Sequence, residues 1–226
     1  MMSEWIGFFW SILPDFYQGT LITVQLTLVG LGMGFVIGLP AALARVYGGK
    51  WVRRLAVGYI ELFRGTPILV QLFVVYFGFP DLGLTLSRLS AAYLALGLNS
   101  GSYQAEYFRG AIQAIGGGQM MAARAIGMSR SKAIRYIILP QALRLVIPPW
   151  SNEPIALMKA SAVVFLIAVP DLMTKAKMIA AHTYNPIGTY MAVAVVYLIL
   201  VFLLTAILHV VERRLRIPGL ELEAKR

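Results

Sequence analysis

An uncharged run from residue 16 to residue 44 is the feature that most constrains how this chain folds. A transmembrane helix needs about 20 consecutive, mostly apolar residues, and this run exceeds that length. The chain as a whole is 59% hydrophobic and only 13% charged, which is typical of membrane proteins rather than soluble domains. The sequence therefore predicts an all-α polytopic membrane protein, with one transmembrane domain over residues 1–226.

Five stretches have the length and composition of membrane spans. They cover about residues 20–44, 55–79, 86–107, 145–169 and 187–211. The third is the most polar and contains Asn99, Ser100, Ser102 and Gln104. The fourth contains three prolines that we expect to interrupt its backbone hydrogen bonding, Pro148, Pro149 and Pro154. The first residues lack the basic region of a cleavable signal peptide, so the first span is expected to remain in the protein.

The basic residues indicate how these spans are oriented. Sixteen of the 20 Lys and Arg residues fall between spans one and two or in the first turns of span two, between spans three and four, and after span five. Basic residues collect on the cytoplasmic side of a membrane, so these three segments are predicted to be cytoplasmic. The N-terminus is then outside and the C-terminus inside. The net charge of +10 therefore reports orientation, and no nucleic-acid partner is expected.

Three glycines recur every four residues in the first span, at Gly30, Gly34 and Gly38. This spacing places them on one face of a helix, where another backbone can approach closely. Packing against another helix of the same chain is the favoured interpretation. Contact with a second subunit is the alternative.

A polar segment between the third and fourth spans, about residues 110–140, is predicted to face the cytoplasm. It carries four basic residues, Arg124, Arg130, Lys132 and Arg135. We expect a short helix over Gln119–Ala125, preceded by the glycines at 116–118 and ended by Gly127. A second, basic helix follows and is expected to stop at Pro140. On pattern alone, a solvated loop helix accounts for this segment.

The spacing within this segment resembles a motif of permease subunits in binding-protein-dependent ABC importers. The motif reads Glu-Ala-Ala, three residues, Gly, nine residues, then Ile-x-Leu-Pro. The positions in register are Ala122, Ala123, Gly127, Ile137, Leu139 and Pro140. Met121 stands where the family has Glu. This departure removes one partner of a salt bridge but leaves the docking shape of the short helix intact.

Other segments resemble the polar amino-acid branch of these permeases, the histidine, arginine and glutamine type. They are residues 61–67 with Gln71, 105–112, 151–153 with Lys159, and 169–172, in the family's order. Two of them share a Glu-x-Phe-Arg-Gly element, in which the carboxylate and the guanidinium are three residues apart on one helix face and can pair. The predicted cytoplasmic ion pairs are therefore Glu61 with Arg64 and Glu106 with Arg109. Anchoring of these side chains at the membrane interface is an equal alternative.

The resemblance implies the type I ABC importer permease fold and a set of partners. These are a second permease subunit, identical or different, two cytoplasmic ATPase subunits that bind ATP and Mg²⁺, an external amino-acid-binding protein, and the lipid of a bacterial or archaeal cell membrane. This chain itself is expected to hold no cofactor. The short cytoplasmic helix corresponds to the family's coupling helix, which docks into the ATPase, here through Gln119, Met121, Ala122, Ala123, Gly127 and Met128.

The sequence lacks the parts of an enzyme. The ATP-binding pattern GxxxxGK[ST] fails at both ends, because Ala44 replaces its first glycine and Trp51 follows Lys50. There is no cysteine, the only histidines are His182 and His209, and neither HExxH nor GxSxG occurs. We therefore predict no catalytic residue and no metal site in this chain.

An ionisable residue at membrane depth marks a candidate transport site, because placing it there costs about 3 kcal/mol. Glu153 lies among the prolines of the fourth span, where we expect non-helical backbone, which must be buried or line a wet cavity. The predicted substrate path consists of Ser151, Asn152, Glu153 and Lys159. The alternative is that Glu153 and Lys159 pair with neighbours and only shape the kinked span.

These observations predict the pore-forming subunit of an ATP-driven amino-acid importer. An anionic path lining favours an amine, so the expected substrate is a polar L-amino acid, a basic one included, or an opine-like derivative. An ion-gradient-driven secondary transporter or channel is the alternative, although two coupled six-span halves are missing. A membrane scaffold is a third class, but a scaffold has no need of Glu153 inside the membrane.

Overall fold

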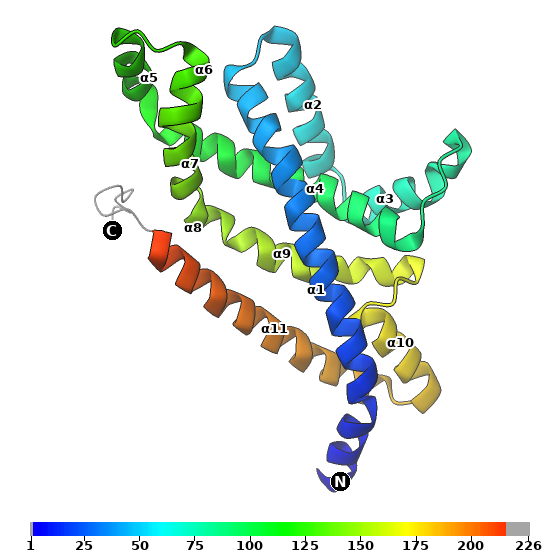
Figure 1. Cartoon of the computed structure of the whole chain (residues 1–226). Helices are drawn as coiled ribbons and strands as arrows, with labels where there is room; N and C mark the ends of the chain where they lie inside the picture. Colours follow the sequence, from blue (N-terminus) through cyan, green and yellow to red (C-terminus); the bar gives the residue numbers. More distant parts are fainter. Residues whose placement is uncertain (1, 216–226) are drawn as a thin grey trace.

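The structure, a computed structural model, describes residues 2–215, apart from the side chains of residues 2–6, 8, 9, 11 and 116. The end of the predicted basic C-terminal segment, residues 216–226, lies outside this range. Every regular element within it is a helix, as predicted (Figure 1). The elements are α1 (Met2–Tyr47), α2 (Lys50–Gly65), α3 (Ile68–Phe73), η1 (Val74–Gly78), η2 (Pro80–Leu82), α4 (Arg88–Ala114), α5 (Gly116–Ala125), α6 (Arg130–Ala133), η3 (Ile134–Ile138), α7 (Leu139–Leu145), α8 (Ile147–Trp150), α9 (Asn152–Ala160), η4 (Ser161–Ile167), α10 (Leu172–Thr183) and α11 (Pro186–Leu215).

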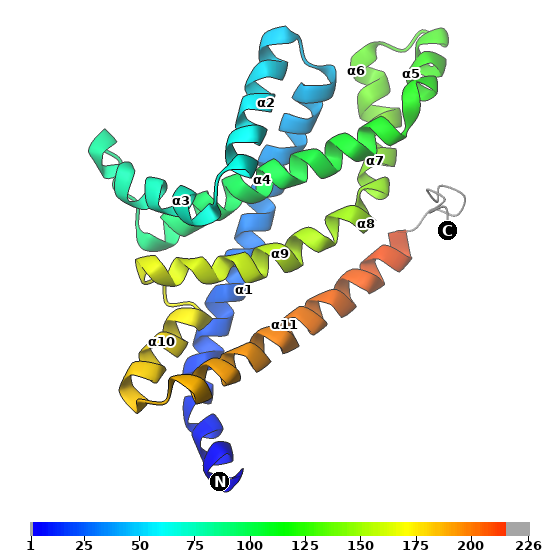
Figure 2. The ribbon, with the colours of Figure 1, turned by 180° about the vertical axis from the view of Figure 1, so that it is seen from behind.

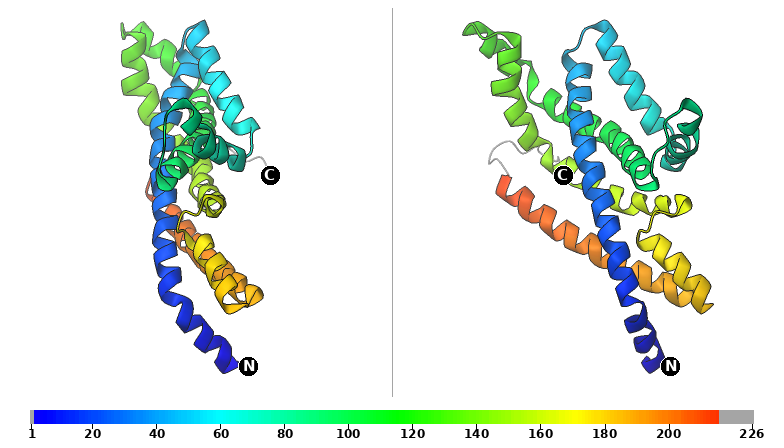
Figure 3. Two further views of the ribbon diagram at one scale, coloured as in Figure 1. Left: turned by 90° about the vertical axis from the view of Figure 1, so that its right-hand side faces the viewer. Right: turned by 45° about the vertical axis from the view of Figure 1, so that its right-hand side comes forward.

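Three helices, α4, α9 and α11, lie one beside the next, and α1 crosses them (Figures 1 and 2). The most extensive contact in the molecule joins α1 to α4, and α1 also touches α2, α9 and α10. Seen from the side, the helices form a thin layer along which α1 runs from end to end (Figure 3). The α5–α6 hairpin projects from one end of this layer, beside the turn between α1 and α2.

Three clusters of buried apolar side chains hold the layer together. The central one joins α1, α3, α4 and α9 around Leu26, Leu72, Leu96 and Leu157. A second joins α1, α10 and α11 around Phe16, Leu172 and Val193. The third lies at the end that carries α5 and joins α1, α4, η3 and α7 around Ala42, Phe108, Ile138 and Ala142. The α5–α6 hairpin is thus attached to a packed support.

By length and apolarity, two described helices can cross a membrane, Ile12–Tyr47 and Pro186–Leu215, and two bent helix pairs raise that number to four. The predicted first and fifth spans lie within the first two. The predicted third span corresponds to α4, which has 27 residues but carries several polar side chains. The count of five spans and their orientation therefore remain predictions.

The predicted second span, residues 55–79, is not one helix. Two helical segments, Lys50–Gly65 and Ile68–Gly78, meet at 106°. The corner is at Thr66 and Pro67, which are extended, because a proline disfavours helical backbone in the residue before it. Gln71 holds the corner, since its Nε2 donates to the carbonyl oxygens of Phe63 at 2.8 Å and Thr66 at 3.0 Å. Asn99 of α4 donates in turn to Gln71 Oε1 at 3.1 Å.

Two expected boundaries around the coupling segment are wrong. The glycines at 116–118 do not precede the short helix but form its first turn, since α5 begins at Gly116. Pro140 does not end the basic helix, because it is the second residue of α7 and the backbone stays helical through it. The π-helical turn η3 lies directly before this proline and changes the hydrogen-bond register where the proline lacks an N–H.

The predicted fourth span comprises α8, α9 and η4, which form one helical segment, Ile147–Ile167, with a helical Ser151 between the first two. The expected interruption by its prolines is therefore wrong. The expectation of non-helical backbone at Glu153 is wrong, because this residue lies in the first turn of α9. The amides of Trp150 and Ser151 still donate to the carbonyl oxygens of Val146 and Ile147, each at 2.9 Å. The prolines therefore remove single donors without unwinding the chain.

Candidate transport and coupling site

A chain of hydrogen bonds crosses the interior from α8 to α9 through α4, and we refer to it as the polar chain. Trp150 Nε1 donates to Gln104 Oε1 at 2.9 Å. Gln104 Nε2 donates to Ser100 Oγ at 3.0 Å and to the carbonyl oxygen of Leu31 in α1 at 3.1 Å. Ser100 Oγ donates to Glu153 Oε1 at 2.7 Å. The polar chain thus ties three elements, α1, α4 and the α8–α9 segment, to one another.

Three members of the polar chain are almost fully enclosed, and the fourth, Trp150, is half-buried. Ser100 and Gln104 have no exposed surface, and Glu153 is 4% exposed. Inside a membrane protein such groups have to find partners within the protein, and the hydrogen bonds above supply them. Of the two carboxylate oxygens of Glu153, Oε1 accepts a hydrogen bond from Ser100. The other, Oε2, accepts none from the described residues. Glu153 therefore keeps one acceptor available for a ligand.

The four predicted path residues do not face the same way. Glu153 is buried against α4, Ser151 is half-buried, and Asn152 and Lys159 are exposed. Ser151 Oγ donates to the carbonyl oxygen of Ile147 at 2.8 Å, within its own helical turn. The structure therefore joins Glu153 to Ser100 and Gln104, two residues that the path prediction did not include. Their signal was the four-residue spacing of polar side chains in the third span.

The glycine face of α1 lies against α4. An added Cβ atom at Gly38 meets Gly101 O at 2.7 Å and Ala105 N at 3.0 Å, and one at Gly34 meets Ser100 Oγ at 2.8 Å. These glycines allow the backbones of the two helices to approach closely. The favoured interpretation, packing within the chain, is therefore confirmed. The close approach also lets Gln104 reach the backbone of α1.

Glu106 gathers arginines from three helices. Its Oε1 pairs with Arg45 of α1, and its Oε2 lies 2.7 Å from Arg109 Nη2 and 3.8 Å from Arg64 Nη1 of α2. The predicted Glu106–Arg109 pair is thus present. Glu61 is exposed and forms no ion pair within residues 7–215, because Arg64 turns toward Glu106 instead. Sequence reasoning missed Arg45, which lies 61 residues away along the chain.

The helix α5 ends in a Schellman motif. Gly127 has a φ of +83°, which glycine adopts without strain. Its amide donates to Arg124 O at 3.1 Å, and the amide of Met128 donates to Ala123 O at 3.0 Å. This closure turns the chain sharply into α6. The predicted position of Gly127 after the last helical turn is confirmed.

The predicted coupling residues differ in exposure. Met121 is 72% exposed, and Gln119, Ala122 and Gly127 are exposed as well. Ala123 is 1% exposed and faces the rest of the chain, so it supports the segment from within. Met128 is half-buried. Ile126, an apolar residue that the sequence analysis did not single out, is 78% exposed.

The coupling segment is attached to the end of α1. The guanidinium of Arg130 lies 5.4 Å from the centroid of the Tyr47 ring, a cation–π contact. The Tyr47 ring thus holds the start of α6 against α1.

The described residues contain no group of three or more acidic, His or Cys side chains that is placed to hold a metal ion. The arrangements of side chains that can bind a ligand or a partner are hence the polar chain, the Glu106 cluster and the exposed face of α5. None of these arrangements pairs a nucleophile with a base. They are suited to binding and to transmitting movement.

Apolar helices around a polar chain, with a helical hairpin that projects from one end, define a membrane-embedded transport subunit. The family follows from a comparison of sequences. Residues 34–217 match the family described as "Binding-protein-dependent transport system inner membrane component". The chain belongs to this family.

Individual relatives are similar over almost the whole length. The glutamine transport system permease protein of Escherichia coli (strain K12) is 38% identical, over 96% of this chain and 100% of its own. The L-cystine transport system permease protein of Bacillus subtilis (strain 168) is 38% identical, over 92% of this chain and 88% of its own. A solved amino acid ABC transporter, crystallised with histidines, is 37% identical and has a TM-score of 0.82, over 89% of this chain and 94% of that chain.

Proposed function

We propose that this chain is the pore-forming subunit of an ATP-driven importer. It passes a polar L-amino acid, a basic one included, or an opine-like derivative from an external binding protein into the cytoplasm. The observation that carries the proposal is α5, which projects from the helical layer of a binding-protein-dependent permease and exposes Met121 and Ile126. The substrate class is supported by the similarity to glutamine and cystine permeases.

The chain works beside a second permease subunit, identical or different, in the inner membrane of a bacterial cell. A single thin layer of helices does not surround a path (Figure 3). Large apolar side chains on α1, such as Leu28 and Val36, are 64% and 70% exposed and require either lipid or another subunit around them. Two cytoplasmic ATPase subunits bind ATP and Mg²⁺, because this chain has no nucleotide-binding pattern of its own.

Movement of the ATPase reaches the transport path through the supports of α5. The helix α5 follows α4 directly, and α6, η3 and α7 lead from it toward α8 and α9. The same α4 carries Ser100 and Gln104. These two side chains form hydrogen bonds with Glu153 in α9 and Trp150 in α8. A displacement of α5 therefore acts on both sides of the polar chain at once. Glu106 ties that displacement to α1 and α2 through its arginines.

Glu153 is the residue that we assign to the substrate path, through its unpaired Oε2. A carboxylate in an enclosed site attracts the amine of an amino acid or a cationic side chain. Asn152 and Lys159, which this chain leaves exposed, border the path on the side of the second permease subunit. In this arrangement Ser100 positions the carboxylate, and Glu153 contacts the substrate.

The partners are tested by gentle purification of the tagged chain from its native membranes, followed by mass spectrometry of every retained protein. We expect a soluble ATPase with a Walker A sequence and an external binding protein, together with the second permease subunit. A folded chain that is recovered alone contradicts the proposal and favours ion-driven transport.

The role of α5 is tested by Ala122→Arg, which places a charge on its exposed face without disturbing the interior. Uptake of labelled glutamine is expected to be lost while the amount of chain in the membrane is unchanged. Ser131→Arg adds the same charge on exposed α6 and is the matched control. Equal uptake by both variants contradicts a docking role for α5.

The role of Glu153 is tested by Glu153→Gln, which keeps the shape and the hydrogen bond from Ser100 but removes the charge. We expect uptake of arginine to fall more than uptake of glutamine, because arginine carries the additional cation. Uptake that is unchanged in rate and in this selectivity removes Glu153 from the path.

A further inference from the structure

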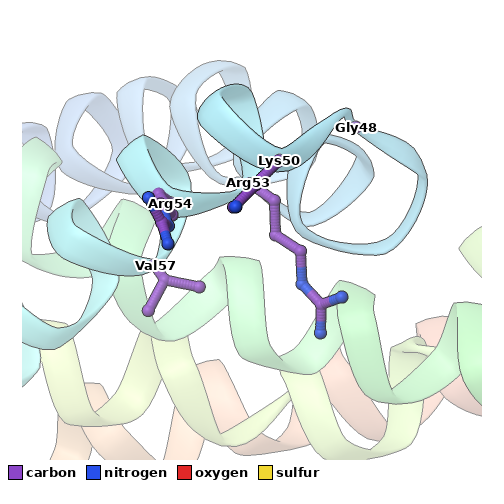
Figure 4. A pocket seen from close by; sticks show the side chains of 5 residues that line it. All are labelled: Gly48, Lys50, Arg53, Arg54 and Val57. Carbon is purple, nitrogen blue, oxygen red and sulfur yellow. The ribbon is translucent and has the colours of Figure 1, made fainter.

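The start of α2 carries a basic face that the proposed transport mechanism does not use. Arg53 and Arg54 lie three and four residues after Lys50, and Val57 lies four and three residues after them, so all four share one side of the helix. With Gly48 of the preceding turn, they line a hollow of about 430 Å³ (Figure 4). Figure 4 shows the two arginine side chains extending from this face of the ribbon on different sides of the hollow.

Among residues 7–215, no ion pair involves the charges of this face. The ion pairs found among the described residues involve other basic residues, namely Arg45, Arg64, Arg109 and Lys175. The carboxylate on the same side of α2 is Glu61, seven residues beyond Arg54 and therefore about 10 Å away along the helix axis. Lys50, Arg53 and Arg54 together present three positive charges around one hollow. An anion is the ligand that satisfies them.

The helix terminus adds to this attraction. The residue before the first turn of α2 is Gly49, and no side chain caps the free amides of that turn. Uncapped amides at a helix N-terminus favour an anion, especially one that basic side chains already hold. The hollow thus combines three cations with a favourable backbone dipole.

The side of α2 next to the basic face is apolar and exposed. Trp51, Leu55 and Leu62 are 73%, 76% and 59% exposed. The guanidinium of Arg54 lies 5.3 Å from the centroid of the Trp51 ring, so the two surfaces meet at this pair. A helix with Lys and Arg on one side and Trp and Leu on the other is typical of the membrane–water interface. The hollow is therefore placed at headgroup level, beside a surface for acyl chains.

We propose that this hollow binds the phosphate headgroup of an anionic phospholipid from the cytoplasmic leaflet. Basic pockets on the cytoplasmic side of membrane helices bind such headgroups. A soluble phosphate satisfies the three charges but leaves Trp51 and Leu55 without a partner, whereas a phospholipid occupies both surfaces. The lipid fixes the α1–α2 turn, which adjoins the coupling segment through Tyr47 and Arg130.

The test uses the full chain in nanodiscs of phosphatidylcholine with a small mole fraction of lipid brominated in its acyl chains. Bromine quenches nearby tryptophan fluorescence, and the contribution of Trp51 is the difference between the natural chain and Trp51→Phe. We expect brominated phosphatidylglycerol to quench Trp51 more strongly than brominated phosphatidylcholine at the same fraction. Each basic residue near an anionic membrane surface contributes about fivefold to binding. In a triple variant, Lys50, Arg53 and Arg54 are each replaced by Gln. The mole fraction of brominated phosphatidylglycerol that quenches half of the Trp51 fluorescence is therefore expected to rise by well over tenfold.

The matched control removes three other exposed charges of the predicted cytoplasmic side, by Arg124→Gln, Lys132→Gln and Arg135→Gln, and keeps the excess quenching. Equal quenching by the two lipids in the natural chain overturns the proposal. Excess quenching that disappears when inorganic phosphate is added at constant ionic strength also overturns it, because the site then takes a soluble anion. Equal loss in the two triple variants overturns it as well, since it reports a general surface charge. Failure of any arm leaves the proposed transport function untouched, because that function rests on α5 and Glu153.

Discussion

Replacement of Gly38 by Ala tests the close approach of α1 and α4. The added Cβ lies 2.7 Å from the carbonyl oxygen of Gly101, and an ordinary contact begins at 3.4 Å, so the helices must separate by about 0.7 Å. Three atoms lie near this Cβ: Gly101 O and Ala105 N belong to the backbone, and Gln104 Cβ is bonded directly to it, so none of them can rotate away. Overpacking of this kind costs about 1–3 kcal/mol. Alanine favours a helix over glycine by about 1 kcal/mol, which offsets part of that cost.

Gly32→Ala is the matched control, because a Cβ at Gly32 meets nothing within 4 Å. The helix preference is the same in both variants, so the difference between them isolates the contact with α4. For a chain of this size, 1 kcal/mol corresponds to about 2–4 °C in the unfolding temperature. We expect Gly38→Ala to unfold about 2–12 °C below Gly32→Ala when tryptophan fluorescence is followed in mild detergent. Equal unfolding temperatures refute the packing argument, and loss of the second permease subunit from Gly38→Ala at unchanged stability assigns the glycine face to a subunit interface.

Three further variants probe the polar contacts. Ser100→Ala removes two interior hydrogen bonds, each worth about 0.6–1.7 kcal/mol in a membrane protein, and is expected to slow uptake more than it lowers the unfolding temperature. Uptake at the natural rate argues against a positioning role. Gln71→Leu removes the Gln71 donor from both carbonyl oxygens at the 106° corner and leaves Phe63 O with only the longer hydrogen bond from Asn99, at 3.3 Å. We expect a loss of about 2 kcal/mol, measured by thermal unfolding, and a stability equal to that of the natural chain shows that the corner needs no such support. Glu106→Gln leaves three arginines without a carboxylate and is expected to reduce coupled ATP hydrolysis in the reconstituted complex, whereas a full ATPase response to the loaded binding protein contradicts the proposed link.

The fold class was predictable because its cause is local. A charge-free run such as residues 16–44 has few alternatives to a membrane helix, and the spacing of Gly30, Gly34 and Gly38 already places them on one face. The end of α5 was equally local, since a left-handed residue after the last turn favours glycine, and Gly127 takes that position. Periodicity and backbone preference were sufficient for these features.

Other features depend on residues that meet only in three dimensions. Glu106 and Arg45 come together because α1 and α4 cross, and no local pattern contains that crossing. The corner at Thr66 was missed because residues 55–79 are apolar enough to resemble one span, although Pro67 was visible. Pro140 was expected to end a helix, and the π-helical turn η3 that accommodates it leaves no clear trace in the sequence. The burial of Ala123 likewise follows from how α5 packs rather than from its composition.

The most direct measurement of the central claim is a site-specific cross-link from α5. The chain contains no cysteine, so Met121→Cys introduces a single reactive thiol on the exposed face of this helix. Tyr184→Cys, at a residue that is 92% exposed on the predicted external side, is the control. In native membranes, a bifunctional reagent is expected to join position 121, and not position 184, to a soluble subunit with a Walker A sequence. Complete labelling of position 121 without any such adduct contradicts the account that α5 couples this permease to ATP hydrolysis.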